Sequence, residues 1–249
     1  MKICSLVPGA TEVVAALGCQ HDLIGISHEC DFPPSLAQIP VMVRPRIESH
    51  HLSSAEIDQQ VGALLTAEAG LYELDETRLL AAGPDLIIAQ ALCDVCAITP
   101  SQLERVVHAL SPPPRMLTLS PGRLDDILLD IETIGTAIGR EEAGTQLSAV
   151  LRSRLDTVRA TVGAQATRPR VACIEWLSPL YTAGHWVPDM VAAAGGIDVL
   201  AQAGTASRKM DWDTLTASEP EVIVLMPCGF TVPRTKAELA SMTAHPQWQ

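Results

Sequence analysis

The stretch Pro84–Cys96, PDLIIAQALCDVC, decides how the rest of the chain is interpreted. Its first part, Asp85–Ala89, is a continuous apolar run without polar alternation, which is typical of a strand covered on both faces in a parallel α/β sheet. Its end carries Cys93 and Cys96, two thiols separated by two residues. Ligands of such sheets bind beyond the carboxyl ends of the strands. The two thiols therefore predict binding or chemistry at this sheet edge.

Composition restricts the classes of protein that fit the chain. Of its 249 residues, 47% are apolar and 18% are charged, which indicates a globular fold. The net charge of −12 argues against nucleic acid and anionic membrane surfaces as partners. No apolar run reaches the ~18 residues of a membrane span, and the first residues do not resemble a signal peptide. We therefore expect a cytoplasmic protein with reduced thiols, or a periplasmic one if an export signal has been removed.

Other apolar runs extend the pattern on the amino-terminal side. A strand over residues 2–7 is followed by Pro8-Gly9 and a helix over residues 12–17. A second strand, residues 23–27, leads into a loop with His28, Glu29 and Cys30. Residues 71–74, which include Tyr72, are predicted to be extended. Strands that alternate with helices predict an α/β lobe.

The carboxyl-terminal side repeats this alternation after a helical region. Apolar residues three or four apart predict helices over residues 124–138 and 141–162. Strands follow at residues 171–176 and 222–226, with a helix over residues 188–194 between them. We predict an amino-terminal lobe at 1–121, a helical connector at 122–167 and a carboxyl-terminal lobe at 168–249. The fold class is α/β, with two Rossmann-like lobes that contain parallel sheets and are joined by one long helix. Because the last lobe shows only two clear strands, we expect the native chain to continue beyond Gln249.

Four predicted loops follow strands and carry most of the side chains suited to binding. We expect these to meet at the facing edges of the two lobes, and they are His28, Glu29, Cys30; Cys93, Asp94, Cys96; Trp176, Tyr181, His185, Trp186; and Cys228, Phe230.

This set of residues supports two kinds of site. Thiolates and imidazole suit zinc, iron or copper(I), so a soft metal is one candidate, with the ligands Cys30, Cys93, Cys96, Cys228 and His185. His185 or a thiolate can also serve as an axial ligand to the cobalt of a corrinoid, while the aromatic rings form flat apolar walls. Simple packing is the alternative, because buried cysteine commonly behaves as a small hydrophobic residue.

Enzymatic function has little support in the sequence. The chain contains no G-x-S-x-G motif, Walker loop or dinucleotide fingerprint. The Cys93–Cys96 pair follows a later strand, whereas a redox C-x-x-C usually opens a helix after the first strand of a thioredoxin-like unit. We predict that the protein is not an enzyme.

Five segments resemble the helical-backbone class (class III) of solute-binding proteins of ABC importers, and within it the cobalamin-binding branch. They are SLVPGATEVVAALG at Ser5–Gly18, GISHECDFPP at Gly25–Pro34, PDLIIAQ at Pro84–Gln90, RPRVACIEWLSPLYTAGHWVPDMVAAAGG at Arg168–Gly196 and SEPEVIVLMP at Ser218–Pro227. The resemblance implies two lobes joined by one long helix, a small hinge motion and a ligand held between the lobes. The cysteine-bearing loops and the absence of an export signal depart from the pattern of the class.

The predicted function is capture of a corrinoid or a related metal-containing ligand by a monomer, with an importer's membrane component as a possible partner. The expected ligand contacts are Glu29, Cys30, Tyr72, Cys93, Asp94, Cys96, Glu175, Trp176, Tyr181, His185, Trp186 and Phe230. Two alternatives remain open. One is a cytoplasmic metal-handling protein that binds zinc or another soft ion through its thiolates, and the other is a thiol-dependent enzyme.

Overall fold

The chain forms two compact units in the computed structural model, which describes residues 1–67, 70–92, 98, 100–163 and 167–248. The first unit comprises Met1–Glu48, Val61–Ser120 and Ile127–Leu151. The second comprises Ser49–Gln60, Pro121–Asp126 and Arg152–Gln249. Within the described ranges, no helix is both long and apolar enough to cross a bilayer.

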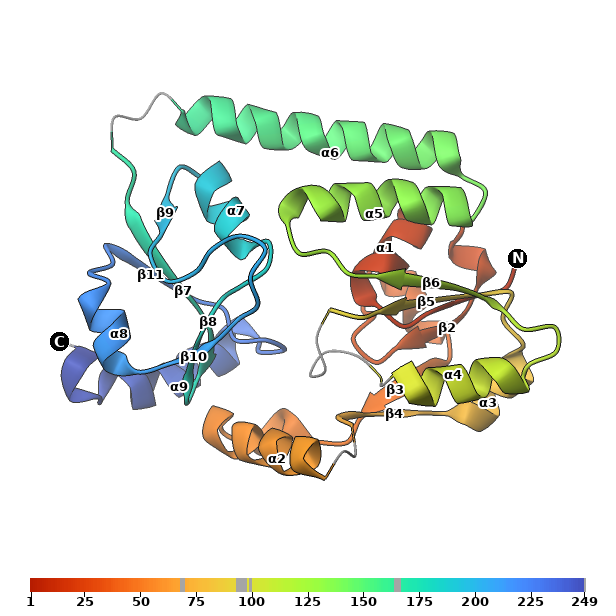
Figure 1. The fold of residues 1–249 in the computed structure, drawn as a ribbon, viewed down its shortest axis with the longest axis horizontal. Coiled ribbons are helices and arrows are strands. Elements are labelled where there is room, and N and C mark those ends of the chain that lie inside the picture. The colour runs from red at the N-terminus through yellow and green to blue at the C-terminus, as the bar shows by residue number, and fades with distance from the viewer. Residues whose placement is uncertain (68–69, 93–97, 99, 164–166, 249) are drawn as a thin grey trace. The chain divides into compact units, whose positions relative to one another are not determined.

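The first unit is built on a six-stranded sheet with the order β4-β3-β2-β1-β5-β6 (Figure 1). All neighbouring strands are parallel except β3 and β4, which are antiparallel. The strands are β1 (Ile3–Ser5), β2 (Leu23–Ser27), β3 (Val41–Pro45), β4 (Tyr72–Leu74), β5 (Leu86–Gln90) and β6 (Arg115–Leu119).

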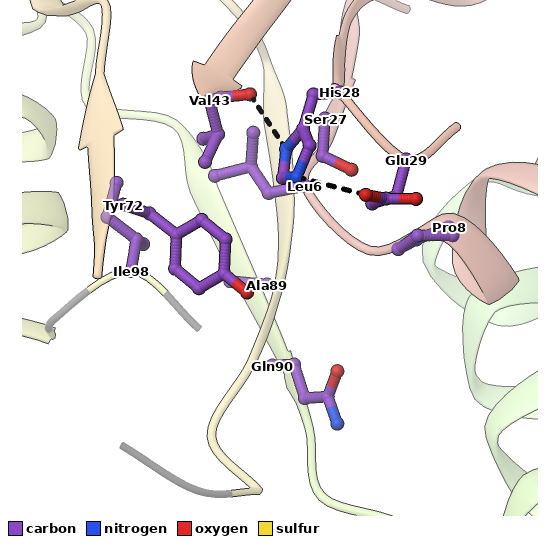
Figure 2. A pocket seen from close by; sticks show the side chains of 10 residues that line it. All are labelled: Leu6, Pro8, Ser27, His28, Glu29, Val43, Tyr72, Ala89, Gln90 and Ile98. Atoms are coloured by element: carbon purple, nitrogen blue, oxygen red, sulfur yellow. Dashed lines mark hydrogen bonds and ion pairs between the residues drawn. The ribbon is translucent and has the colours of Figure 1, made fainter. Parts of the chain in front are cut away.

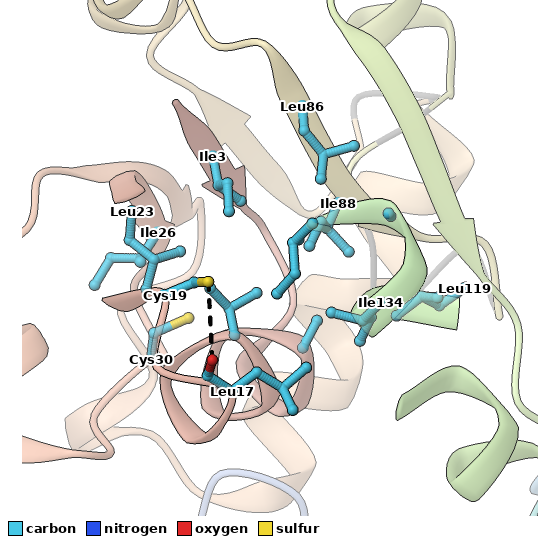
Figure 3. Close-up of a cluster of buried hydrophobic side chains, with 14 of the residues drawn as sticks. Ile3, Leu17, Cys19, Leu23, Ile26, Cys30, Leu86, Ile88, Leu119 and Ile134 are labelled. Carbon is cyan, nitrogen blue, oxygen red and sulfur yellow. Dashed lines mark hydrogen bonds between the residues drawn. The ribbon is translucent and has the colours of Figure 1, made fainter. Parts of the chain in front are cut away.

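Successive residues of a strand point to opposite faces of the sheet. Because apolar residues point to both faces here, helices cover both. Ile3 and Ile88 face a core formed with α1 (Pro8–Ala16) and α5 (Leu124–Ala137), which Figure 3 shows. Cys4 and Ile87 face a second core with α3 (Glu76–Ala82) and α4 (Pro100–Ala109). The prediction from Asp85–Ala89 of a strand covered on both faces is therefore confirmed.

The long helix α6 (Glu141–Val162) packs against α5 through two glycines. A Cβ added at Gly135 would lie 3.0 Å from the Cα of Gly144, and one added at Gly144 would lie 3.1 Å from the Cα of Gly135. Only residues without a side chain allow the two backbones to approach this closely. Both predicted helices are confirmed, with ends within one residue of those expected.

The second unit is organised around β7 (Arg170–Leu177), the centre of a five-stranded sheet. Its order is β10-β8-β7-β11, and β9 pairs with the start of β7. β11 and β9 run parallel to β7, whereas β8 runs antiparallel to both β7 and β10. The other strands are β8 (Leu180–Thr182), β9 (Ile197–Asp198), β10 (Lys209–Met210) and β11 (Val222–Leu225).

Both faces of β7 are covered. Ala172 and Ile174 pack in a core that includes Leu215 of α8 (Trp212–Ala217) and Met242 of α9 (Val232–Thr243). Val171 and Cys173 face α7 (Val187–Ala193). β11 lies at the sheet edge, and its apolar residues Val222–Val224 are each more than a third exposed.

The structure confirms an α/β fold with two units but differs in detail from the expected parallel sheets. Both sheets are mixed, because the chain adds short antiparallel strands at β4, β8 and β10. The first helix begins at Pro8 rather than Glu12, since proline is well suited to the first position of a helix. In addition, α2 (Ser54–Thr66) starts within the second unit, although the predicted division placed it in the first lobe.

Candidate functional site

A pocket lies on the first unit where the parallel strands β1, β2 and β5 end. Parallel strands bring their carboxyl ends to one edge of the sheet, where α/β proteins bind ligands. The pocket encloses about 130 Å³. As Figure 2 shows, its lining combines apolar and polar side chains, namely Leu6, Pro8, Ser27, His28, Glu29, Val43, Tyr72, Ala89, Gln90 and Ile98.

The His28 ring is held in the pocket by contacts at both of its nitrogens. Nδ1 lies 3.2 Å from the carbonyl oxygen of Val43, and because a carbonyl only accepts, Nδ1–H is the donor. Nε2 lies 3.3 Å from Oε1 of Glu29 (Figure 2). The backbone N–H of His28 also donates to Val43. These contacts fix the imidazole beside a carboxylate at the end of β2.

Tyr72 contributes the phenol of the pocket from the antiparallel edge strand β4. Its ring centroid lies 5.7 Å from that of His28, with the two planes tilted by 37°. The prediction of an extended stretch at residues 71–74 is confirmed by β4. The predicted ligand residues Glu29 and Tyr72 thus line one pocket together with His28.

Cys30 points into the core next to the pocket. Its backbone N–H donates to the carbonyl of Ser27, which forms a tight turn after β2. The Sγ atom lies 3.1 Å from Oγ1 of Thr11 and 3.3 Å from Oγ of Ser27, and the residue is 7% exposed. Burial, with a smaller contribution from Cys30, raises the pKa of the nearby Cys4 thiol to about 12. Cys30 is therefore a core thiol in a hydroxyl-rich environment.

The C-x-x-C loop provides no geometric test of the metal prediction. Cys93, Asp94 and Cys96 lie outside the described residues. Within the described ranges, no three histidine, cysteine or acidic side chains are grouped so that they could hold a metal ion. A metal site that includes Cys93 and Cys96 stays a prediction.

In the second unit, Trp176, Tyr181 and Phe230 gather around the start of α2. The Trp176 and Phe230 rings make an edge-to-face contact at 5.3 Å between centroids. Trp176 Nε1–H donates to the carbonyl of Ser54 at 3.1 Å. The Tyr181 hydroxyl donates to Oδ1 of Asp58 at 3.4 Å, and its pKa is raised by burial and by this carboxylate.

His185 and Trp186 form a second pair, 5.9 Å apart between ring centroids. His185 has a φ of 54°, a conformation that residues with a Cβ seldom adopt. Its N–H donates to the carbonyl of Thr205, and its own carbonyl accepts from Gly204. Trp186 packs against the core over α7. The backbone on both sides of His185 is thus held by the loop at 204–205.

Cys228 and Glu175 meet through the backbone, where the N–H of Cys228 donates to the carbonyl of Glu175 at 3.2 Å. Cys228 is exposed, unlike the buried Cys4, Cys19, Cys30 and Cys173. Metal ligation by Cys228 and His185 stays a prediction.

Sequence reasoning left several contact residues out of the predicted ligand set. His28 was assigned to the correct loop but was not included among the ligand contacts, and Gln90 was not considered. His28 directly follows the buried strand β2 and Gln90 is the last residue of β5, so the position at a strand end was the available signal. Ser54, Arg234 and Glu238, which make long-range contacts in the second unit, left no pattern in the sequence.

The fold is an α/β fold, and a pocket lies at the ends of its parallel strands. The chain belongs to the family described as periplasmic binding protein, whose pattern matches residues 3–249. Members of this family bind ligands and are not enzymes, which sets aside the thiol-dependent enzyme.

Individual relatives are distant in sequence. The chain is 23% identical to the vitamin B12-binding protein of Vibrio cholerae serotype O1 over 231 residues, which is 89% of this chain and 69% of the relative. It is 22% identical to the periplasmic haem-binding protein RhuT of Roseiflexus sp. RS-1, with a TM-score of 0.68 over 90% of this chain and 75% of that one. An ABC transporter substrate-binding protein of Listeria monocytogenes EGD-e is 17% identical, with a TM-score of 0.69 over 99% and 83% of the two chains.

Proposed function

We propose that this protein is the solute-binding component of an ABC importer and that its ligand is a metal tetrapyrrole, either a corrinoid or haem. The family supports solute binding, and the relatives named for vitamin B12 and haem support this ligand class. The observation that carries the proposal is the pocket, in which a phenol and an imidazole from different strands lie side by side.

The chemistry of the pocket fits the rim and the metal of such a ligand. Imidazole and phenolate oxygen are both groups that ligate the iron of haem, and imidazole also suits cobalt. Leu6, Val43, Ala89 and Ile98 supply apolar contact area for a flat macrocycle. The Val43 carbonyl accepts from Nδ1–H and orients the ring, as second partners of metal-binding histidines commonly do, and Glu29 must leave Nε2 before that nitrogen can bind a metal.

Size limits how much of the ligand this pocket can take. Small-molecule sites typically enclose about 300–1,000 Å³, whereas this pocket encloses about 130 Å³. Only part of a tetrapyrrole therefore fits in this pocket. The remaining predicted contacts, which include Trp176, Tyr181 and His185, belong to the second unit and stay a prediction.

Titration of the purified protein with hemin and with aquocobalamin tests the proposal. We expect saturable changes in the visible spectrum with at least one of the two, at a stoichiometry of about one ligand per chain. Protein that leaves both spectra unchanged and retains neither ligand on gel filtration would contradict the proposal. Metal analysis of the reduced protein as purified tests the thiolate alternative, which needs Cys93 and Cys96.

A further inference from the structure

Residues 49–60 pack on the second unit although the sheet of that unit begins more than one hundred residues later in the chain. Their main attachment is Glu238 of α9. Its carboxylate accepts from Ser54 Oγ at 2.7 Å and from Ser54 N at 3.2 Å. Ser54 begins α2 and is 1% exposed. A carboxylate at a helix start satisfies backbone N–H groups and interacts favourably with the helix dipole.

Arg234, one turn before Glu238 on α9, holds the residues that lead into α2. Its Nη2 donates to the carbonyl of Ser49 at 2.8 Å and to the carbonyl of Leu52 at 2.9 Å. The same guanidinium lies 3.6 Å from the centre of the Phe230 ring. Two opposite charges on one face of α9 therefore hold residues 49–60. Arg234 binds the residues before α2, and Glu238 binds Ser54, the first residue of α2.

Residues of the same segment accept hydrogen bonds from two side chains that were expected to face the ligand. The indole N–H of Trp176 donates to Ser54, and the hydroxyl of Tyr181 donates to Asp58. Phe230 lies against Trp176 and under Arg234. The indole N–H and the phenol hydroxyl of this aromatic face are thus already hydrogen-bonded to a backbone carbonyl and a carboxylate of the chain itself.

We propose that residues 49–60 are a strap that covers the aromatic face formed by Trp176, Tyr181 and Phe230, and that the strap must detach for a tetrapyrrole to bind there. The inference rests on the proposed function, because it assigns this face to the ligand. The named attachments are hydrogen bonds, which water can replace when the strap leaves, unlike the buried contacts of a hydrophobic core. A bound macrocycle would take over the contacts of the three rings.

Only molecules from which the strap has detached can bind the ligand at this face. The apparent affinity for the ligand is therefore reduced to the extent that this detached fraction is small. Removing an attachment that holds only the covered state should therefore tighten ligand binding. Glu238 is the best choice because it contacts the strap and is not among the expected ligand residues.

The experiment compares wild type, Glu238→Gln and Glu238→Ala with Asp211→Asn as the matched control. Asp211 is also a carboxylate that caps a helix of the second unit, since it accepts from Thr214 N and Oγ1 at the start of α8. Hydrogen exchange of the ligand-free proteins follows the amides of residues 54–58, and titration with hemin and aquocobalamin gives the dissociation constants. Glu238→Gln keeps the size of the side chain and serves for the comparison if Glu238→Ala does not fold.

We expect amides 54–58 to exchange at least about tenfold faster in the Glu238 variants, and the dissociation constant to fall at least about tenfold, as weakening of the charge-assisted hydrogen bonds from Ser54 predicts. Asp211→Asn should change neither quantity. Faster exchange with unchanged or weaker ligand binding would overturn the strap while leaving the proposed function intact. Exchange at the wild-type rate would overturn it as well, because Glu238 would then not hold the segment. If no protein in the set binds either probe, the proposed function and the strap both fail.

Discussion

The ring of Tyr72 lies 5.7 Å from the ring of His28, although β4 and β2 are separated in the sheet by β3. This is possible because both side chains reach over the end of β3 toward the same pocket (Figure 2). Two side chains of types that can ligate a metal therefore lie together at an edge that the strand order alone would not bring into contact.

Replacing Tyr72 by phenylalanine should separate ring packing from ligation. The variant keeps the aromatic contact with His28 and loses only the phenol oxygen. We expect the dissociation constant for hemin to rise about tenfold, since even a hydrogen bond to a charged group contributes about 1.5 kcal/mol. The visible spectrum of the complex should also shift. His108→Ala, at an exposed histidine whose ring contacts the carbonyl of Glu104, is the control and should leave both unchanged. An unaltered spectrum and affinity in Tyr72→Phe would remove the phenol from the site.

Arg123 should contribute measurably to the stability of the second unit. Its Nε and Nη2 donate to the two carboxylate oxygens of Asp189 at 3.1 and 2.7 Å. Because the arginine side chain is 59% exposed, we expect Arg123→Ala to lower the midpoint of urea unfolding only slightly. Arg123→Lys should recover part of this, since lysine lacks the two-pronged geometry. Arg152→Ala removes an ion pair with Asp125 that has a single hydrogen bond, and it should lower the stability less than Arg123→Ala does. Equal losses of stability would show that the two-pronged pair of Arg123 contributes nothing extra.

Asp189 should make stability depend on acid pH. Its pKa is lowered from the ordinary value of 3.8, first by the Arg123 hydrogen bond and then by the Leu124 N–H and the Arg123 charge. The folded state therefore binds this proton only at lower pH than the unfolded state does. The contribution is complete above pH 3.8 and is lost as the pH falls through the folded-state pKa. Urea unfolding at pH 5 and pH 3 should show a smaller difference in Asp189→Asn than in wild type. The same pH dependence in both proteins would contradict this.

Gly184 should tolerate no side chain. An added Cβ would collide with the backbone N of Ser207 and would lie 2.8 Å from both the carbonyl carbon of Ala206 and the carbonyl oxygen of Thr205. Gly184→Ala must push these backbones apart, and we expect a loss of about 2–3 kcal/mol in stability. Gly62→Ala is the control, because a Cβ there meets nothing within 4 Å on the helix α2. Helix propensity should make that variant slightly more stable. A stable Gly184→Ala would show that the loop at 205–207 can move.

The described thiols should differ sharply in reactivity. Burial raises the pKa of Cys4 to about 12 and that of Cys173 to about 11, and Asp198 adds to the shift at Cys173. Cys228 is exposed. Because the thiolate is the reactive form, iodoacetamide at pH 8 should modify Cys228 in the native protein while Cys4 and Cys173 react only after unfolding. Peptide mass spectrometry with and without denaturant measures this. Labelling of Cys4 as fast as Cys228 would contradict the core described above.

Long and strongly patterned elements could be predicted from the sequence. The strand at Asp85–Ala89 follows from a continuous apolar run, and the helices α5 and α6 follow from apolar residues three or four apart, because hydrophobic burial decides all three. Short strands could not: β8, β9 and β10 have only two or three residues each, too few for a periodic pattern. β8 and β9 pair with β7, and β10 pairs with β8, so these strands form because a neighbouring strand offers an unpaired edge, which is a property of the tertiary fold and not of their own residues.

The sequence was enough to predict the kind of site and its place at the strand ends, but not the direction and contacts of each side chain. Position after a strand identified the loop of His28 and Glu29, but it gave no direction for each side chain. Cys30 turns inward because its N–H bonds back to Ser27, a turn that spacing alone does not reveal. Trp176 and Tyr181 were expected to be ligand walls, and their contacts with Ser54 and Asp58 involve residues more than 120 positions away in the chain.

The cap that Glu238 places on Ser54 has a consequence for biosynthesis. The two residues are 184 positions apart, so the ribosome completes the first turn of α2 long before its carboxylate partner emerges. During that interval the nascent helix relies on the local bond between Ser53 and Glu56. Final docking of this turn is therefore a late event in the life of the new polypeptide, and a ribosome that stalls before α9 leaves it without its partner.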